Sequence, residues 1–403
     1  MSKIIIDRNK IEEVLTRGVV EILVKDELKK RLLSGRKLRI KLGIDPTGSV
    51  LHLGHAVVLR KLKEFQNLGH QIIFLIGDFT ARIGDPTGRS SVRKPLSDKE
   101  IKENMKSYIK QAGLILDIKK MEIRHNSEWL DKLSFGELVN LASKVTYSQV
   151  AQRADFKERI KNDKDLSLQE FLYPIMQGYD SVMLKADVEI GGMDQKFNML
   201  MGRQLQKRYD QEPQDIIMCP ILEGTDGKEK MSKSLNNYIA LAETAEDMYG
   251  KIMSLADNLI IRYFQLCAET PAEEIEKMEN QLAKNEVNPR DLKMKLAFEI
   301  VKIYHGEKKA REAEEYFVKT VQKKEVPEEV EELKVKSGKW KAVDLLMEIK
   351  LAGSKSEARR LIEQGGIKID GEVMKDINKE VEISGEEMMI QRGKRQFVRV
   401  VKK

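Results

Sequence analysis

Residues 38–55 read Leu-Arg-Ile-Lys-Leu-Gly-Ile-Asp-Pro-Thr-Gly-Ser-Val-Leu-His-Leu-Gly-His, and the class of fold follows from the pattern of these residues. Its first half alternates apolar residues with others, as a strand does, and residues 45–48 end that pattern. A helical pattern then runs to Leu68, and Gly69 closes it ahead of the wholly apolar run 72–76. Strand, helix and buried strand in this order are typical of a right-handed parallel βαβ unit.

The rest of the first half extends this unit. Alternating helical and strand-like stretches predict a Rossmann-like α/β domain with a parallel sheet, which we place at residues 1–235. An amphipathic spacing of apolar residues predicts a long helix over residues 9–33. Residues 236–322 are helical in pattern and rich in Lys and Glu, so we expect an α-helical domain there.

The C-terminal part is predicted to be a separate unit. Residues 323–338 are densely charged and contain one proline, so we expect a linker. Residues 339–403 then form a small α+β domain. From residue 338 onward the chain carries 15 Lys or Arg and 11 Asp or Glu, so this part contributes +4 of the formal charge of +7.

The composition is that of a globular protein. Of 403 residues, 41% are hydrophobic and 34% charged, which excludes a disordered or fibrous chain. No apolar run approaches the roughly 18 residues of a membrane span, and the first residues lack the apolar block of a secretory signal. Cys219 and Cys267 cannot form a disulfide framework and are not spaced to bind zinc. We therefore expect a cytoplasmic protein with free thiols and no bound zinc.

The helix that begins after residues 45–48 is a candidate phosphate site. Exposed N–H groups at a helix start attract anions. His52 and His55 are three residues apart, so both can point at one ligand, and Gly54 between them lets a bulky group approach the backbone. Two hydrogen-bonded histidines at an ordinary helix cap are the alternative. That two of only five histidines flank a glycine at this switch favours the ligand site.

A second candidate is the segment Lys230-Met231-Ser232-Lys233-Ser234. A lysine-rich loop is more often plain surface charge. Opposite a phosphate-binding helix start, however, a mobile lysine loop would supply cations as charge builds on a polyphosphate.

Together the two segments resemble the His-Ile-Gly-His and Lys-Met-Ser-Lys-Ser signature motifs of class I aminoacyl-tRNA synthetases. The second matches letter for letter, the first reads His-Leu-Gly-His, and they lie about 175 residues apart. Nucleotidylyltransferases share the first motif but not the second at this distance. The resemblance implies that ATP is a substrate, that His52 and His55 bind its phosphates, and that Lys230 and Lys233 stabilise the departing pyrophosphate. Further ATP contacts that it implies are Gly54, Asp194, Lys233 and Ser234. Mg²⁺ would arrive with ATP and not in a protein cage.

A third segment indicates the amino acid. Tyr173, Gln177 and Asp180 fall at steps of four and three, so they share one helical face. Asp180 could accept the hydroxyl proton of a phenol while Tyr173 and Gln177 hold an α-ammonium. From spacing alone, incidental polar groups on a partly buried helix are the more common explanation.

This segment resembles the Tyr-x-x-x-Gln-x-x-Asp amino-acid site of the bacterial-type tyrosyl-tRNA synthetases. Residues 191–195, Gly-Gly-Met-Asp-Gln, resemble their Gly-Gly-Ser-Asp-Gln loop, and the resemblance extends over nearly the whole chain. It implies that Asp85 binds the substrate ammonium and that Asp45 and Gln195 line the tyrosine cleft.

Two positions depart from that family. Many members carry Tyr-Cys-Gly-Phe-Asp in the strand before the first motif, and that tyrosine touches the substrate hydroxyl. This chain has Lys41 there, and Met193 where serine is common. The partner that assists Asp180 is therefore open, and Asp78 at the end of the second strand is one candidate.

The C-terminal unit resembles the S4 RNA-binding fold. Lys355 and Arg359 lie one helical turn apart, Arg360 follows, and a Gly-Gly turn leads to Lys368 in a short strand. On charge alone this could be an ordinary solvated face, but the resemblance favours a surface that neutralises RNA phosphates.

The resemblance implies an enzyme that activates L-tyrosine with ATP and transfers it to the 3′ end of tRNA(Tyr), with a helical domain that binds tRNA. It also implies a homodimer. Three other interpretations remain: a tryptophanyl-tRNA synthetase, an RNA-binding protein without catalysis, and a nucleotidylyltransferase for a small cofactor. The sequence does not decide between the two terminal ribose hydroxyls as acceptor.

Overall fold

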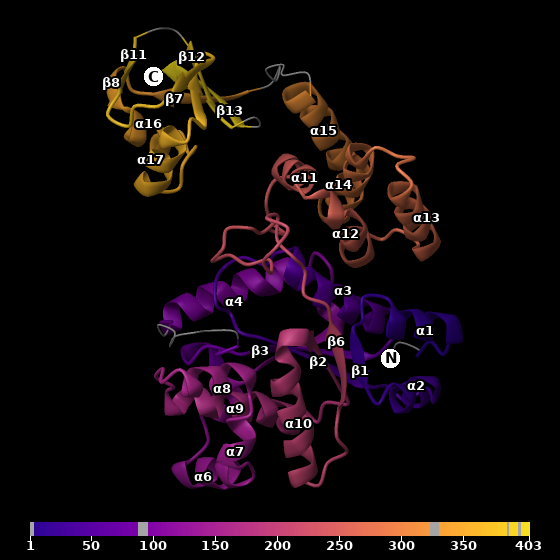
Figure 1. Ribbon diagram of the computed structural model, residues 1–403. Coiled ribbons are helices and arrows are strands. Elements are labelled where there is room, and N and C mark those ends of the chain that lie inside the picture. Colours follow the sequence, from indigo (N-terminus) through magenta and orange to yellow (C-terminus); the bar gives the residue numbers. More distant parts are fainter. Residues whose placement is uncertain (1–3, 88–95, 323–329, 385–386, 394–395) are drawn as a thin grey trace. The chain divides into compact units, whose positions relative to one another are not determined.

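The computed structural model describes residues 4–87, 96–322, 330–384, 387–393 and 396–403. The chain forms two compact units (Figure 1). Residues 1–242 and 255–287 make the first unit, and residues 243–254 and 288–403 make the second.

The first unit is built on a six-stranded sheet with the strand order β1-β6-β5-β2-β3-β4. Its strands are β1 (Glu21–Leu23), β2 (Arg39–Ile44), β3 (Gln71–Ile76), β4 (Met121–His125), β5 (Val188–Gly192) and β6 (Asp215–Cys219). All neighbours are parallel except the edge strand β1, which runs antiparallel to β6. The predicted parallel α/β sheet is therefore confirmed.

Twelve α-helices accompany this sheet in the described part of the first unit. They are α1 (Arg8–Thr16), α2 (Lys25–Leu33), α3 (Leu53–Asn67), α4 (Asp98–Ala112), α5 (Ser127–Leu130), α6 (Phe135–Ser143), α7 (Tyr147–Val150), α8 (Ala154–Lys161), α9 (Leu168–Leu184), α10 (Lys196–Arg208), α12 (Ile260–Cys267) and α13 (Ala272–Ala283). Helix α9 packs on the face of β3 that carries Ile73 and Leu75. Both faces of β3 are covered, which explains its wholly apolar sequence.

The predicted helix over residues 9–33 is wrong. The structure has α1 and α2 there, with β1 between them. Gly18 has a φ of +60°, and Val24, just before α2, has a φ of +63°, so the backbone cannot continue as one helix. The apolar residues of β1 fall at positions that also fit a helical period, and pairing with β6 decides between the two.

Residues 255–287 group with the first unit and not with the helical domain predicted for residues 236–322. Helix α12 packs on α3, and the carbonyl oxygen of Ala268 accepts hydrogen bonds from Arg17 and Arg60, each at 2.9 Å. These contacts join residues that are far apart in the sequence, so no local sequence pattern predicts them.

The described part of the second unit contains three more α-helices, a π-helix at Val318–Gln322 and a small β-rich domain. Its helices are α11 (Ala245–Met253), α14 (Pro289–His305) and α15 (Glu307–Phe317), followed in the small domain by α16 (Ala342–Glu348) and α17 (Lys355–Glu363). The strands of the small domain are β7 (Glu331–Val335), β8 (Gly338–Lys341), β9 (Ile367–Ile369), β10 (Glu372–Met374), β11 (Glu380–Ile383), β12 (Glu387–Arg392) and β13 (Gln396–Lys402). They form a five-stranded sheet, β10-β9-β12-β13-β7, and the separate pair β11-β8.

Part of the predicted linker is a strand. Residues 331–335 form β7, which pairs in parallel with β13, and Val335 is buried in the core of the small domain. Its charged residues are exposed, and Glu331 lies on the same face of the strand as Val335, so the period of two is concealed. The other part of the predicted linker, residues 323–329, lies outside the described residues.

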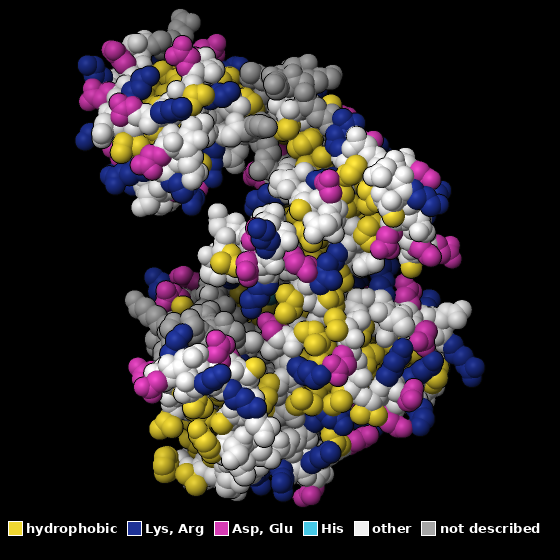
Figure 2. Space-filling model, viewed as in Figure 1, with side chains coloured by type: hydrophobic (Ala, Val, Ile, Leu, Met, Phe, Trp, Pro, Cys, Tyr) yellow, Lys and Arg dark blue, Asp and Glu magenta, His cyan; other side chains and the backbone are white. Residues whose placement is uncertain are grey.

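One surface of the first unit is unusually apolar. Phe135 on α6 and Leu168 at the start of α9 are 81% and 83% exposed, and Val139 and Tyr147 are also exposed. Figure 2 shows hydrophobic side chains gathered over α6 and α7, at the lower left. We call these four residues the α6–α7 patch. No helix in the described ranges is both long and apolar enough to cross a membrane.

Candidate active site

A cleft of about 800 Å³ opens at the carboxyl ends of β2 and β5. From β2 the strand order continues to β3 and β4 on one side and to β5 and β6 on the other, and the crevice at such a switch point is where ligands bind in open α/β sheets. The predicted site residues that line it are Asp45, His52, Gly54, His55, Asp85, Tyr173, Gln177, Asp180, Asp194, Gln195, Lys230, Lys233 and Ser234. The two signature segments thus face one cavity.

The two histidines form a contact pair at the start of α3. Their ring centroids are 3.9 Å apart, and the backbone N–H of His52 donates to Nδ1 of His55 at 3.2 Å. Burial lowers the pKa of His52 to about 2 and that of His55 to about 3, and the charge of Lys233 adds to both shifts. Both imidazoles are therefore neutral at pH 7. The buried Nδ1 of His52 makes no hydrogen bond within the described part of the chain.

Gly54 brings the two signature segments into contact. Its N–H donates to Sδ of Met231 at 3.4 Å. A Cβ atom on residue 54 would lie 3.0 Å from the ring of His52 and 3.6 Å from Cβ of Met231. Any side chain there would have to displace the imidazole, so the glycine preserves this junction.

The two loop lysines lie near different walls of the cleft. Nζ of Lys233 donates to the hydroxyl of Tyr108 on α4 at 3.4 Å, and Nζ of Lys230 lies 3.5 Å from Oδ2 of Asp194. Ser234, the last of the predicted ATP contacts, has its Oγ 2.6 Å from that of Ser232. Two ammonium groups therefore border the cavity that the neutral histidines also face.

A buried asparagine organises the lysine loop. Oδ1 of Asn237 accepts from the N–H of Ser232 at 2.7 Å, and its Nδ2 donates to Asp226 at 2.7 Å and to the carbonyl oxygen of Lys230 at 3.1 Å. Asn237 was not predicted from the sequence. Its place three residues after the motif was the only available signal.

Asp180 lies at the buried end of the cleft. It is 2% exposed, and its carboxylate accepts from Nε1 of Trp129 at 2.9 Å and from Nδ2 of Asn126 at 3.3 Å. Burial raises its pKa to about 7, and the charge of Lys41 opposes that rise. The sequence analysis missed Asn126 and Trp129, although Asn126 directly follows β4 at the edge where the cleft opens.

Asp45 is held between the two walls of the cleft. Its carboxylate accepts from the hydroxyl of Tyr173 at 2.8 Å and from Oγ1 of Thr80 at 2.7 Å. A Cβ on Gly77 would lie 2.0 Å from Oδ1 of Asp45, so the end of β3 admits the carboxylate only because residue 77 has no side chain.

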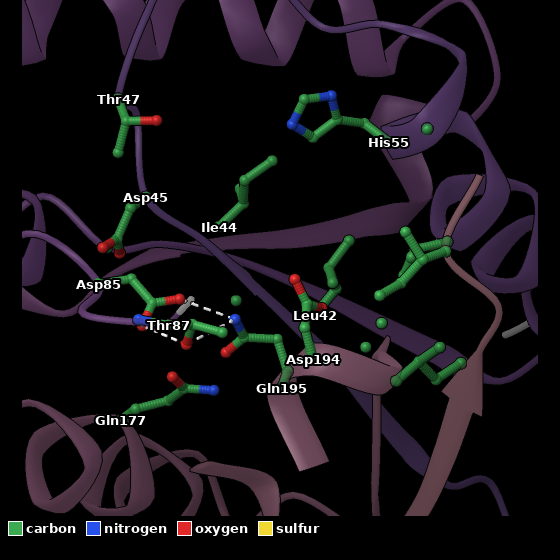
Figure 3. A pocket seen from close by; sticks show the side chains of 18 of the residues that line it. Leu42, Ile44, Asp45, Thr47, His55, Asp85, Thr87, Gln177, Asp194 and Gln195 are labelled. Carbon is green, nitrogen blue, oxygen red and sulfur yellow. Dashed lines mark hydrogen bonds between the residues drawn. The ribbon is translucent and has the colours of Figure 1, made fainter. Parts of the chain in front are cut away.

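Asp85 and Gln195 form a second polar group in the cleft (Figure 3). Nε2 of Gln195 donates to Oδ2 of Asp85 at 2.7 Å, and Oγ1 of Thr87 donates to Oδ1 at 2.6 Å. The buried Arg153 places Nη2 3.4 Å from the same Oδ1. His55 lies across the cavity from Gln177 and Gln195 (Figure 3). Arg153, which the sequence analysis missed, is the cation nearest to this carboxylate among the ion pairs of the described residues.

Asp78 does not line the cleft. Its carboxylate accepts from the N–H of Ser127 at 3.0 Å and from its Oγ at 2.7 Å, and so caps the start of α5. We therefore withdraw it as the partner of Asp180.

The predicted RNA contacts lie in the small domain. Lys355, Arg359 and Arg360 are exposed on α17, and Lys368 lies in β9. Nζ of Lys355 is 2.8 Å from Oδ1 of Asp344. The basic surface exists as expected, and its role stays a prediction.

A Rossmann-like sheet with a histidine pair at a helix start and a lysine loop across the same cleft defines a class I aminoacyl-tRNA synthetase. Residues 33–322 match the model of the class I tRNA synthetases for tryptophan and tyrosine, and residues 322–400 match the C-terminal domain of the SYY-like tyrosine–tRNA ligases. The chain belongs to the tyrosine–tRNA ligase family.

Relatives matched over nearly their whole length carry the same family name. The chain is 51% identical over 388 residues to the tyrosine–tRNA ligase of Thermotoga maritima, covering 96% of each protein. It is 50% identical over 398 residues to that of Carboxydothermus hydrogenoformans, covering 96% of this chain and 97% of the relative. A C-terminally truncated mitochondrial tyrosyl-tRNA synthetase of Aspergillus nidulans matches the fold with a TM-score of 0.63 and 25% identity, over 76% of this chain and 92% of that one.

Proposed function

We propose that this chain joins L-tyrosine to ATP, forming tyrosyl-adenylate and pyrophosphate, and then transfers tyrosine to the 3′ end of tRNA(Tyr). The observation that carries the proposal is the single cleft that holds the histidine pair and lysine loop together with Asp180. Membership of the tyrosine–tRNA ligase family supports it.

In the first step, the tyrosine carboxylate attacks the α-phosphorus of ATP and the bond to the bridging oxygen of pyrophosphate breaks. The enzyme supplies position and countercharge and needs no covalent intermediate. We assign hydrogen bonds to the phosphates to the neutral His52 and His55, and countercharge for the pyrophosphate to Lys230 and Lys233. The other proposed ATP contacts are Gly54, Asp194 and Ser234. Mg²⁺ is proposed to enter bound to ATP.

The other end of the cleft is proposed to bind tyrosine. Asp180 would accept the phenolic hydroxyl, and Tyr173, Gln177 and Asp85 would surround the ammonium. Asp45 and Gln195 would line the space between them. In the second step a terminal ribose hydroxyl of tRNA attacks the tyrosyl carbonyl and AMP leaves.

Pyrophosphate exchange into ATP, measured with each amino acid in turn, tests the proposal. We expect exchange with tyrosine and not with tryptophan or phenylalanine. Exchange driven by tryptophan would indicate the tryptophan enzyme. Exchange with no amino acid would favour an RNA-binding protein without catalysis or a nucleotidylyltransferase for another substrate.

The small domain is proposed to bind tRNA through α17. The Arg359→Ala/Arg360→Ala double variant should weaken tRNA charging and lower the salt dependence of tRNA affinity, its log–log slope falling by about 2, because each lost phosphate contact removes about one unit. Tyrosine-dependent exchange should be unchanged. The matched control is Lys375→Ala/Lys379→Ala, which removes two exposed cations elsewhere on the same domain. Equal losses in both variants would assign the effect to net charge and contradict the site.

We propose a homodimer formed through the α6–α7 patch, because contiguous exposed apolar surface marks an interface. Phe135→Glu should weaken self-association about 30-fold, the loss of about 2 kcal/mol expected at an interface hot spot. Leu114→Glu, at an exposed leucine outside the patch, is the control. Sedimentation equilibrium measures both, and an unchanged dimer in Phe135→Glu would contradict the proposal.

We place the enzyme in the cytoplasm. Both cysteines are buried free thiols, which a reducing compartment maintains.

A further inference from the structure

Lys41 is a fully buried cation beside the proposed tyrosine site. It lies in the middle of β2 with 0% exposure. Its Nζ donates to Oε1 of Glu189 at 2.9 Å, to Oγ of Ser181 at 2.9 Å and to the carbonyl oxygen of Gln177 at 3.3 Å. All three ammonium protons therefore have acceptors, which a buried charge requires.

These contacts connect three elements around one helical turn. Gln177 and Ser181 lie on α9, three residues before and one residue after Asp180, and Glu189 lies opposite Lys41 in the register of β5. Both carboxylate oxygens of Glu189 accept hydrogen bonds. Lys41 donates to Oε1, Ser181 donates to Oε2 at 3.2 Å, and Gln214 donates to the same Oε2. The ammonium thus fixes the turn of α9 that carries both Gln177 and Asp180.

Lys41 is fully buried and does not line the cleft, so we do not assign it a direct contact with the substrate hydroxyl. We propose that Lys41 is a positioning residue for tyrosine recognition, which holds the turn of α9 that presents the Asp180 carboxylate to the phenolic hydroxyl. This inference deepens the proposed function and rests on it.

The charges around Asp180 support this role. Lys41 on β2 and Glu189 on β5 are the charged groups that act most strongly on it, Trp129 and Asn126 contribute neutral donors, and Tyr173 shares its helix. Burial raises the pKa of Asp180, Lys41 lowers it, and Glu189 raises it by less than Lys41 lowers it. Removing the cation should therefore favour the protonated acid, which is a weaker acceptor for the substrate hydroxyl than the charged carboxylate.

Two substitutions of opposite sign test the inference. Lys41→Met should raise the KM for tyrosine about fivefold at pH 7 with little change in the KM for ATP. The acidic limb of kcat/KM for tyrosine should move up by about one pH unit, and a shift of that size from a pKa of about 7 lowers the ionised fraction of Asp180 at pH 7 about fivefold. Glu189→Gln removes the competing anion at constant shape, so its acidic limb should move down. A merely structural contact would not shift the two limbs in opposite directions.

Lys61→Met is the matched control. Lys61 is also buried, at 2% exposure, and donates to the carbonyl oxygens of Val14 and Arg17, away from Asp180. The Lys61→Met substitution should leave the acidic limb of kcat/KM for tyrosine unchanged, even if it lowers the stability of the protein. The inference would be overturned if the acidic limb of kcat/KM for tyrosine stayed in place in both Lys41→Met and Glu189→Gln. Equal rises in the KM for tyrosine and the KM for ATP in Lys41→Met would also overturn it. A wild-type enzyme with no tyrosine-dependent exchange would instead refute the proposed function.

Discussion

Asp180→Ala should lower kcat/KM for tyrosine in pyrophosphate exchange about 100-fold while leaving the KM for ATP nearly unchanged. The variant loses a charged hydrogen-bond acceptor for the substrate hydroxyl, and such a bond contributes about 1.5–3 kcal/mol. A 100-fold loss corresponds to about 2.7 kcal/mol. Steady-state exchange at varied tyrosine and varied ATP separates the two substrates.

Alanine at residue 180 also leaves the donors of Trp129 and Asn126 unpaired in a buried place. Asp180→Asn keeps the volume and should fold, so it shows whether the loss follows the carboxylate. Glu170→Gln is the control on the same helix, because Glu170 is buried against Arg159 and does not line the cleft. Normal tyrosine kinetics in both Asp180 variants would contradict the assigned tyrosine site.

Lys233→Ala should lower the rate of adenylate formation about 100-fold to 1000-fold with a small effect on the KM for tyrosine. The charge that it would stabilise develops on the departing pyrophosphate, and removing one such group typically has an effect of this size. Nζ of Lys233 lies beside the loop before α3, where a Cβ on Gly48 would be 2.5 Å away, and its charge acts on His52 and His55 at the start of that helix.

Lys228→Ala is the control for Lys233→Ala. Lys228 belongs to the same loop but is exposed and does not line the cleft. Single-turnover adenylate formation, followed by tryptophan fluorescence or quenched flow, measures both variants. If Lys233→Ala and Lys228→Ala formed adenylate at similar rates, Lys233 would have no specific role and the lysine loop would be ordinary surface charge.

The central βαβ unit could be predicted because its signals are local. The alternation in residues 38–44 marks β2 as a strand, although its second face also buries Lys41, and the apolar run 72–76 reports that both faces of β3 are buried. The edge strand β1 and the strand β7 could not, because partners far along the chain, β6 and β13, determine them. Short segments with mixed polarity adopt whichever structure tertiary pairing stabilises.

The same division holds for the cleft. The histidine pair and the lysine loop were recognised from short motifs, and the structure brings both to one cavity. The groups that tune the motif residues were not recognised. Trp129 reaches Asp180 from α5, and Arg153 reaches Asp85 from just before α8, without any spacing that relates them in sequence. Lys41 was noticed as a departure from the family, but its contacts with Ser181 and Glu189 were not predicted.

The glycine that follows β3, Gly77, restricts which substitutions this enzyme can accept during evolution. Because a methyl group at Gly77 would overlap the carboxylate of Asp45, the two positions behave as one inherited unit. Replacement at either alone would release Tyr173 from its acceptor. Lineages of this enzyme should therefore retain the pair intact or exchange both members together.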